Sequence, residues 1–136
     1  NCVMKDGRKT AATRVVYDAM DLIDGKLAKE TDPNKPEGSL DVFHLAIENV
    51  KPYVEVRSKR IGGANYQVPM QVPKRRQQSL SFRWIIDAAR KEKGRPMAQR
   101  LADELYAAAK NEGKAMQVRE QTIRMAEANK AFAHFA

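Results

Sequence analysis

The sequence predicts a mainly α-helical fold, in which a bundle of five to six helices carries one inserted, protruding β-hairpin arm. Apolar residues recur with helical spacing over most of the 136 residues. Between residues 53 and 72 the spacing changes to every second residue on both sides of Gly62-Gly63, which is typical of a hairpin. The segment from Lys51 to Arg76 contains seven basic residues and one acidic residue, so most of the net charge of +8 lies in the arm and at its base.

Two helices are expected before the arm. Thr10 is a candidate N-cap for the first, which is expected to end near Gly25. A polar loop with two prolines and a glycine follows over residues 29–38. Ser39 is the candidate N-cap of the second helix, and Pro52 stops that helix. The expected core positions of both helices are Ala12, Val15, Val16, Ala19, Leu22, Ile23, Leu40, Phe43, Ile47 and Val50.

The arm is expected to consist of two strands joined by a tight turn at Gly62-Gly63. Apolar residues alternate with polar ones on both strands, and Val56 of the first strand is expected to be in register with Val68 of the second. Pro69 cannot donate a hydrogen bond to a neighbouring strand. Its strand is therefore expected to leave that side unpaired, as the edge of a projecting arm would.

Three helices are expected after the arm. Pro73 favours a helix start, and this helix is expected to end near Gly94. Pro96 starts the next helix, Gly113 stops it, and a last helix runs from about Met116 toward the C-terminus. The expected core positions of these helices are Leu80, Trp84, Ile85, Ala88, Ala89, Met97, Leu101, Leu105, Ala108, Val118, Ile123 and Met125.

The residue content gives little support for an enzyme or a metal site. His44 and His134 are the only histidines, and Cys2 is the only cysteine. Zinc sites, thiol chemistry and phosphate-loop binding need combinations of residues that this sequence lacks. No apolar run approaches the roughly 18 residues that a membrane span requires. We therefore expect no catalytic residue, no metal, no cofactor and no membrane partner.

Basic residues outside the arm gather in two further segments, KDGRK at residues 5–9 and EKGRP at residues 92–96. Several basic loops on a helical body suit a phosphate backbone that is followed over a wide surface. Tyr53 and Tyr66 add aromatic rings that could stack on bases. We therefore expect residues 1–136 to form a single domain that binds a polyanion.

Three long motifs carry a resemblance to the bacterial or organellar small-subunit ribosomal protein seven family: CVMKDGRK (2–9), ENVKPYVEVRSKRIGGANYQVPMQVPKRR (48–76) and RMAEANKAFAHFA (124–136). The resemblance implies a structural constituent of the small ribosomal subunit that binds the 3′ major domain of its RNA and nucleates head assembly. It also implies a hairpin near the exit-site transfer RNA and the messenger exit path. Neighbouring small-subunit proteins of the head and platform, on a cytoplasmic or organellar ribosome, are the further implied partners.

The same resemblance implies which residues make contacts. The expected ribosomal RNA contacts are Lys5, Arg8, Lys9, Lys74, Arg75, Arg76, Arg83, Lys93, Arg95, Met97, Arg100, Lys114 and Arg119. The expected contacts of the arm with transfer, messenger or ribosomal RNA are Arg57, Lys59, Arg60, Gly62, Gly63, Asn65 and Tyr66. The basic N-terminal tail of the family is expected to be absent. The acidic loop of residues 30–39 is expected to face solvent, because it would repel phosphate.

One alternative remains from the residues alone, a DNA-bending architectural protein, since such proteins also combine a helical body with basic β-arms. Those arms commonly carry an apolar residue or a proline at the tip, which inserts between base pairs. Here residues 61–65 read IGGAN, and the only arm proline lies partway along the second strand. The tip therefore disfavours this alternative. An enzyme is a weaker third alternative, for want of a catalytic constellation.

Overall fold

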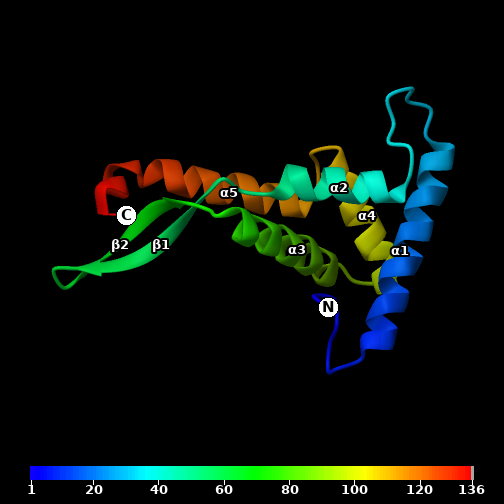
Figure 1. Ribbon diagram of the computed structural model, residues 1–136, viewed down its shortest axis with the longest axis horizontal. Helices are drawn as coiled ribbons and strands as arrows, with labels where there is room; N and C mark the ends of the chain where they lie inside the picture. Colours follow the sequence, from blue (N-terminus) through cyan, green and yellow to red (C-terminus); the bar gives the residue numbers. More distant parts are fainter. Residues whose placement is uncertain (136) are drawn as a thin grey trace.

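The computed structural model describes residues 1–135, and this part of the chain contains five α-helices, one 3-10 helix and one β-hairpin. The elements follow the order α1 (Lys9–Lys29), α2 (Ser39–Val50), β1 (Val54–Ile61), β2 (Ala64–Gln71), α3 (Lys74–Lys91), α4 (Met97–Ala109), α5 (Lys114–Ala128) and η1 (Lys130–Phe135). Figure 1 shows α1 to α4 gathered at one end of an elongated molecule, with the hairpin extending toward the other end. The predicted helical bundle with an inserted hairpin is confirmed.

The centre of the helical body is α4, which packs against α1, α2 and α3. Ala102 and Ala108 of α4 are fully buried, and their small side chains let the neighbouring helices approach closely. Trp84 is only half-buried at the edge of this core. The other buried core residues are Ala19, Ile23, Leu27, Val42, Ala46, Ile47, Val50, Ile85, Ala88, Ala89, Leu101, Leu105, Ala115 and Met116.

Helix α1 continues beyond Gly25 to Lys29, so the predicted end of this helix is wrong. Leu27 is buried and lies four residues after Ile23, which carries the apolar face of α1 past the glycine. The burial of Leu27 offsets the conformational cost of a helical glycine, which is about 0.5–1 kcal/mol. Thr10 is also not the N-cap, because the helix already begins at Lys9.

Helix α2 is capped by a side chain from α1 rather than by its own serine. Asp24 accepts hydrogen bonds from the Ser39 backbone N–H at 2.8 Å and from the Ser39 hydroxyl at 3.2 Å. Ser39 is the first residue of α2, so its predicted role as N-cap is wrong. In the intervening loop, Lys35 Nζ donates to the Leu27 carbonyl at 2.8 Å and so satisfies the C-terminal end of α1.

Some predicted core positions are instead exposed, because the buried face of each helix is narrower than its apolar pattern. Leu40 is the clearest case, with 61% of its surface exposed. The buried residues of α2 are Val42, Ala46, Ile47 and Val50. The other predicted core positions that are exposed are Val16, Leu22 and Met125.

The hairpin turn follows the prediction. Strands β1 and β2 pair antiparallel, and Gly62 and Gly63 join them with φ values of 60° and 85°. These left-handed values favour glycine at both turn positions. At the other end, the Val72 N–H donates to the Tyr53 carbonyl at 3.0 Å. Hydrogen-bonded and non-hydrogen-bonded residue pairs alternate along an antiparallel ladder, so the pair of Val56 and Pro69 is a non-hydrogen-bonded one and needs no N–H from Pro69. Pro69 therefore fits its strand without a lost hydrogen bond.

The register of the hairpin differs from the prediction. Val68 lies opposite Arg57 and Val56 lies opposite Pro69, so the two valines face opposite sides of the hairpin. Val68 is fully buried and Glu55 on the same side is 7% exposed, whereas Val56 is half-buried. The alternation of apolar residues in β1 was misleading, because the covered side of this strand carries a neutralised glutamate.

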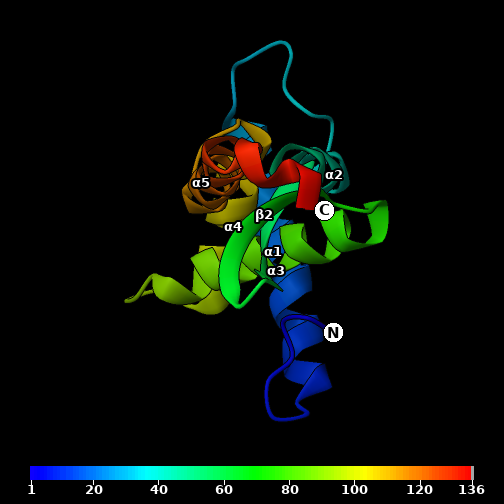
Figure 2. The same ribbon diagram turned by 90° about the vertical axis from the view of Figure 1, so that its left-hand side faces the viewer.

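The C-terminal elements cover that side of the hairpin. Helix α5 contacts β1, and η1 lies against β2 (Figure 2). The Tyr66 ring lies 5.2 Å from the ring of Phe132 and 5.2 Å from that of Phe135, measured between centroids. Lys59 Nζ donates to the Phe135 carbonyl at 2.7 Å. The arm therefore extends from the body with one side packed and the other open.

Candidate nucleic-acid interface

The N-terminal basic residues lie on a tight turn that leads into α1. Asp6 and Gly7 have φ values of 56° and 73°, and the Arg8 N–H donates to the Lys5 carbonyl at 3.1 Å. Asp-Gly favours such a turn, because both central residues take left-handed values. The turn presents Lys5 and Arg8 at its two ends, and Lys9 begins the helix. All three side chains are exposed.

A shallow depression of about 410 Å³ joins this turn to the end of α3 and the start of α4. Its walls include the side chains of Lys5, Arg8, Met97 and Arg100, four of the predicted RNA contacts. The Arg100 guanidinium is fixed in place by a hydrogen bond that it donates to the Glu92 carbonyl. The depression therefore brings the cations of the N-terminal turn next to Arg100, which lies far away in the sequence.

Arg90 also lines this depression, and the sequence prediction missed it. Its guanidinium donates to the Val3 carbonyl at 3.3 Å, which ties α3 to the N-terminal segment. The signal was present, because Arg76, Arg83 and Arg90 are seven residues apart and two helical turns place them on one face. A helical wheel of α3 would have added Arg90 to the predicted contacts Arg76 and Arg83.

Three helices begin with a lysine, a position where the helix dipole disfavours positive charge. Lys9, Lys74 and Lys114 are the first residues of α1, α3 and α5, and none of these helices has an acidic residue in its first turn. The N-terminal end of a helix carries partial positive charge and unpaired N–H donors. Lysines at these ends add to that potential, which suits an external anion such as phosphate at α1 and α3. At α5 the buried Glu104 carboxylate already accepts a hydrogen bond from the Ala115 N–H at 2.9 Å.

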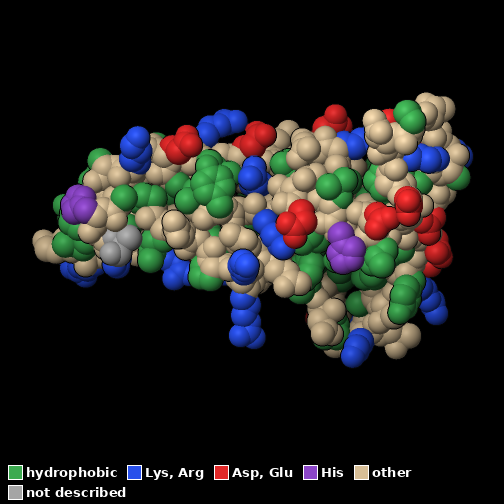
Figure 3. Space-filling model, turned by 45° about the horizontal axis from the view of Figure 1, so that its top comes forward, with side chains coloured by type: hydrophobic (Ala, Val, Ile, Leu, Met, Phe, Trp, Pro, Cys, Tyr) green, Lys and Arg blue, Asp and Glu red, His purple; other side chains and the backbone are tan. Residues whose placement is uncertain are grey.

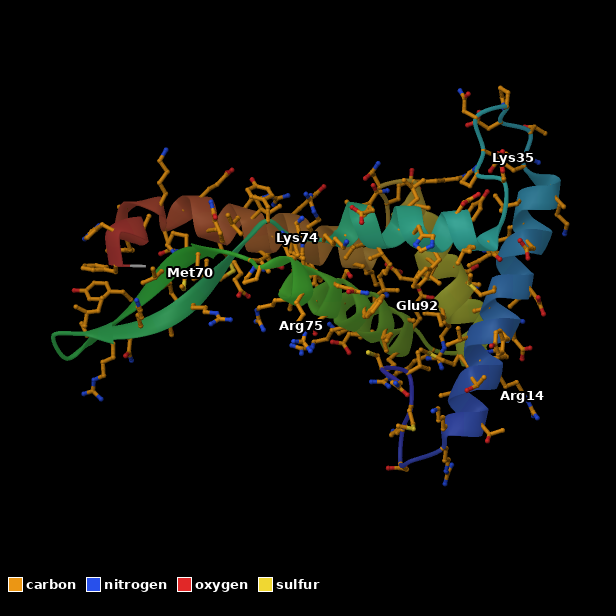
Figure 4. All side chains as sticks on the ribbon, viewed as in Figure 1. Arg14, Lys35, Met70, Lys74, Arg75 and Glu92 are labelled. Carbon is orange, nitrogen blue, oxygen red and sulfur yellow. The ribbon has the colours of Figure 1, made fainter. Side chains whose placement is uncertain are left out.

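At the base of the arm the predicted residues divide into two kinds. Lys74, Arg75 and Arg83 are exposed and have no acidic partner among residues 1–135. Figure 4 shows Arg75 projecting from the first turn of α3, at the opposite end of that helix from Glu92. Arg76 instead pairs with Glu55 through two hydrogen bonds of 2.7 and 3.0 Å. This pair holds the pKa of Glu55 below its usual range.

Arg119 is likewise engaged within the protein, since its Nε donates to the Lys51 carbonyl at 3.0 Å. The bond joins α5 to the segment that leads into β1. Arg119 therefore holds the base of the arm in addition to any contact that its remaining guanidinium nitrogens make.

The loop of residues 92–96 contains an ion-pair network. Arg95 pairs with Glu92 at 2.9 Å and with Asp103, and Lys26 of α1 also pairs with Asp103. The hydrogen bonds that Arg95 donates to Asp103 and Glu92 raise the pKa of Arg95. Lys114 lies 3.8 Å from Glu92, whereas Lys93 is exposed without an ion pair in the described chain. Of the predicted contacts here, Lys93 alone is left fully available to an external anion.

The predicted residues of the arm also differ in availability. Arg57 Nε donates to Glu55 at 3.2 Å, and Lys59 is bonded to the Phe135 carbonyl. Tyr66 packs between aromatic rings, so its predicted role in base stacking is not supported by its surroundings. The tip residues Arg60, Gly62, Gly63 and Asn65 are exposed. The structure therefore leaves the tip as the most accessible part of the arm.

The charges are unevenly distributed over the surface. On the face in Figure 3, acidic side chains gather over the helical body at the right, while Lys and Arg line the lower edge of the hairpin end. Within residues 1–135 no group of His, Cys, Asp and Glu side chains is placed to hold a metal ion. No helix in the same part of the chain is long and apolar enough to cross a membrane.

A helical body with a basic arm and grouped, unpaired cations defines a protein of the nucleic-acid-binding class. Comparison with known proteins makes this specific. Residues 1–130 match the model of the family described as ribosomal protein S7p/S5e. The chain belongs to this family, a family of ribosomal proteins and not of enzymes.

Several curated relatives carry the name small ribosomal subunit protein uS7. The protein of Rhodopirellula baltica is 60% identical over 136 residues, which cover 100% of this chain and 83% of the relative. Those of Nautilia profundicola and Thermotoga neapolitana are 56% and 53% identical, with 99% of this chain and 82% of each relative covered. The family resemblance inferred from the motifs is confirmed, and it selects the ribosomal interpretation over the DNA-bending one. The chain is a small-subunit ribosomal protein with ribosomal RNA and ribosomal proteins as partners, and its bacterial relatives indicate a cytoplasmic ribosome.

Proposed function

We propose that this chain binds the 3′ major domain of the small-subunit ribosomal RNA as one unit and nucleates assembly of the subunit head. The observation that supports this most directly is the grouping of cations without acidic partners. They occupy the N-terminal turn (Lys5, Arg8, Lys9), the start of α3 (Lys74, Arg75), its exposed face (Arg83) and the loop after it (Lys93). Such a surface spans the length of α3 and suits a folded RNA backbone.

The remaining predicted RNA contacts have a second part in this proposal. Arg76, Arg95, Arg100 and Arg119 each hold protein atoms as well, so they shape the surface on which RNA lies. Met97 supplies an apolar wall of the basic depression. Lys114 lies at the N-terminal end of α5, where it adds to the positive potential of the helix end.

The salt dependence of RNA binding tests this proposal. If the surface neutralises about six to ten phosphates, log affinity falls with log salt with a slope of roughly −0.7 to −0.9 per contact. Filter binding with a transcript of the 3′ major domain measures that slope, and duplex DNA of equal length serves as the competitor. Affinity that is flat between low and moderate salt, or equal for both nucleic acids, would overturn the proposal.

We further propose that the hairpin tip, residues 60–65, lies near the exit-site transfer RNA and the messenger exit path. Its support is the family resemblance together with the exposure of Arg60, Gly62, Gly63 and Asn65. Replacing the tip by a shorter turn that keeps Arg57 opposite Val68 preserves the observed register. The shortened protein should enter subunits normally while exit-site transfer RNA occupancy changes. Normal entry with unchanged occupancy and reading-frame fidelity would refute a functional tip.

Neighbouring proteins of the head and platform are the proposed protein partners. Tyr17, Leu40 and Tyr53 are 67%, 61% and 53% exposed, and large apolar side chains of this kind commonly lie in protein interfaces. Photocrosslinkers at these three positions should capture ribosomal proteins in assembled subunits. Capture of RNA alone at all three would contradict this part of the proposal.

A further inference from the structure

Glu55 is the only acidic residue between Lys51 and Arg76, and it is buried. Its two carboxylate oxygens accept hydrogen bonds from Arg76 Nε at 2.7 Å and from an Arg76 terminal nitrogen at 3.0 Å. Arg57, on the same strand, donates to the first of these oxygens at 3.2 Å. An acid at the centre of a basic arm would weaken RNA binding if it faced solvent, so its burial between two arginines calls for another role.

The Glu55–Arg76 pair joins the hairpin directly to α3, whereas α5 links the two only indirectly, by packing against β1 and against α3. Glu55 lies near the start of β1, and Arg76 lies in the first turn of α3. A bidentate pair between a planar guanidinium and a carboxylate fixes orientation as well as distance. Gln77, the next residue of α3, donates to the Val72 carbonyl at 3.1 Å. A single hydrogen bond of this kind restrains the distance between the two segments but does not fix their orientation.

We propose that Glu55 is a positioning residue for RNA binding, which holds the hairpin arm at a fixed angle to α3 through its paired arginines. The proposal rests on the proposed binding of ribosomal RNA. We call the Glu55–Arg76 pair the joint between arm and α3. The exposed cations at the start of α3 and those on the arm lie on opposite sides of this joint. Both groups can contact one RNA backbone at the same time only when the angle between the arm and α3 is fixed. A loose joint makes the RNA order the arm on binding, which lowers affinity.

This role predicts an effect of opposite sign to the one expected from charge alone. Glu55→Gln removes a negative charge from the arm, and net charge alone would make RNA binding tighter. The amide cannot accept both hydrogen bonds from Arg76, because its nitrogen is a donor that faces another donor. The proposal therefore expects binding to the 3′ major domain transcript to weaken, by about three- to tenfold.

Glu120→Gln is the matched control. Glu120 is an exposed acid on α5 whose one ion pair within residues 1–135 is a 3.6 Å contact with the exposed Arg124. Its replacement changes net charge by the same amount without touching the joint, so RNA affinity should stay equal or rise slightly. Glu55→Gln binding that matches this control would overturn the proposal.

A second variant keeps the net charge constant. Arg76→Lys retains a cation, but an ammonium group cannot make the planar double contact with Glu55. RNA affinity should fall by about the same factor as for Glu55→Gln, and the double variant should be no weaker than either single one. Arg14→Lys on the far side of α1 is the control for the chemical change itself (Figure 4). Losses that multiply in the double variant would show independent RNA contacts and contradict a joint.

Hydrogen exchange separates positioning from unfolding. In Glu55→Gln the amides near the joint, from Tyr53 to Arg57 and from Val68 to Val72, should exchange faster, while those of α4 keep their protection. If α4 amides also lose protection, the weakened binding reflects a destabilised fold, and the role of Glu55 is structural only. If the unchanged protein itself shows no salt-dependent RNA binding, the proposed function fails. If that binding is present but Glu55→Gln leaves its affinity unchanged, only the positioning role of Glu55 fails.

Discussion

The helical body and the hairpin arm use basic residues in different ways. In the body, Lys110 pairs with Glu30 at 3.0 Å, and Arg95 pairs with both Glu92 and Asp103. At the arm tip and base, Arg60 and Arg75 have no such partner among residues 1–135. The same side-chain type thus stabilises the fold at Lys110 and Arg95 and remains available to bind an anion at Arg60 and Arg75.

Local acidic partners, rather than the number of basic residues, decide where a polyanion can bind on this protein. The loop of residues 92–96 has two basic residues, yet its arginine is already neutralised by acids from its own loop and from α4. The arm contains one acid, and that acid is buried. A large part of the +8 net charge is therefore exposed at the arm and along α3.

The largest expected effect concerns the body. Ile23 is fully buried in the centre of the core, so Ile23→Ala should lower the free energy of unfolding by about 2–5 kcal/mol. Val16→Ala on the same helix is the control, because Val16 is exposed and should change it by less than about 1 kcal/mol. Denaturant unfolding measures both. Equal losses would show that the buried face of α1 is assigned wrongly.

A pair of arginine variants tests the contrast itself. Arg75→Ala should reduce RNA affinity by about three- to tenfold and the salt slope by about one unit, with an unchanged melting temperature. Arg95→Ala should lower the melting temperature, because Asp103 and Glu92 lose a shared partner, while the salt slope changes little. Thermal unfolding and filter binding of both variants measure this. If Arg95→Ala reduced the salt slope and Arg75→Ala lowered the melting temperature instead, local acidic partners would not decide which arginine binds RNA.

Local sequence signals predicted most of the fold. The helical spacing located five helices, and Gly62-Gly63 located the turn, because both signals depend on neighbours in the chain. The end of α1 was wrong, because the burial of Leu27 against other helices outweighed the glycine signal. Propensity is a local quantity, and tertiary packing overrides it wherever a side chain can be buried.

The candidate site was only partly predictable for the same reason. The clustering of cations is visible in the sequence, but their pairing is not, because Arg95 meets Asp103 and Arg76 meets Glu55 only after folding. The register of the hairpin could not be read either, since Glu55 occupies a side that alternation assigns to solvent. Availability for RNA thus depends on contacts between distant segments.

An acid in the body gives a pH-dependent test of its ion pairs. The Tyr106 hydroxyl and then Lys110 lower the pKa of Glu30 from 4.5 to about 2. Because the folded pKa is the lower one, the contribution of Glu30 to stability is present above pH 4.5 and is lost as the pH falls toward 2. Glu30→Gln should therefore lower the melting temperature at pH 7 and converge with the unchanged protein near pH 2.

The control for that experiment is Glu127→Gln, an exposed acid near the end of α5 without an ion pair in the described chain. It should follow the unchanged protein at every pH. A Glu30→Gln deficit that stays constant across the acid range would mean that packing of Tyr106, rather than the charge of Glu30, stabilises this part of the body.

The smallest expected effects come from one substitution made in both regions. Gly25 lies inside α1 and Gly63 lies at the arm tip with φ of 85°, and an added Cβ would meet no atom within 4 Å beyond its chain neighbours and, at Gly25, the backbone of its own helix. Gly25→Ala should raise the free energy of unfolding by about 0.5–1 kcal/mol, because alanine favours a helix. Gly63→Ala should instead strain a left-handed residue by about 1–2 kcal/mol. That strain should appear as faster hydrogen exchange at the tip with little change in global unfolding, because the tip has few contacts with the core.

A Gly25→Ala variant that is less stable would mean that the helix ends at this glycine after all. A global loss of stability in Gly63→Ala would show that the arm folds as part of the body rather than as an appendage fixed at its base.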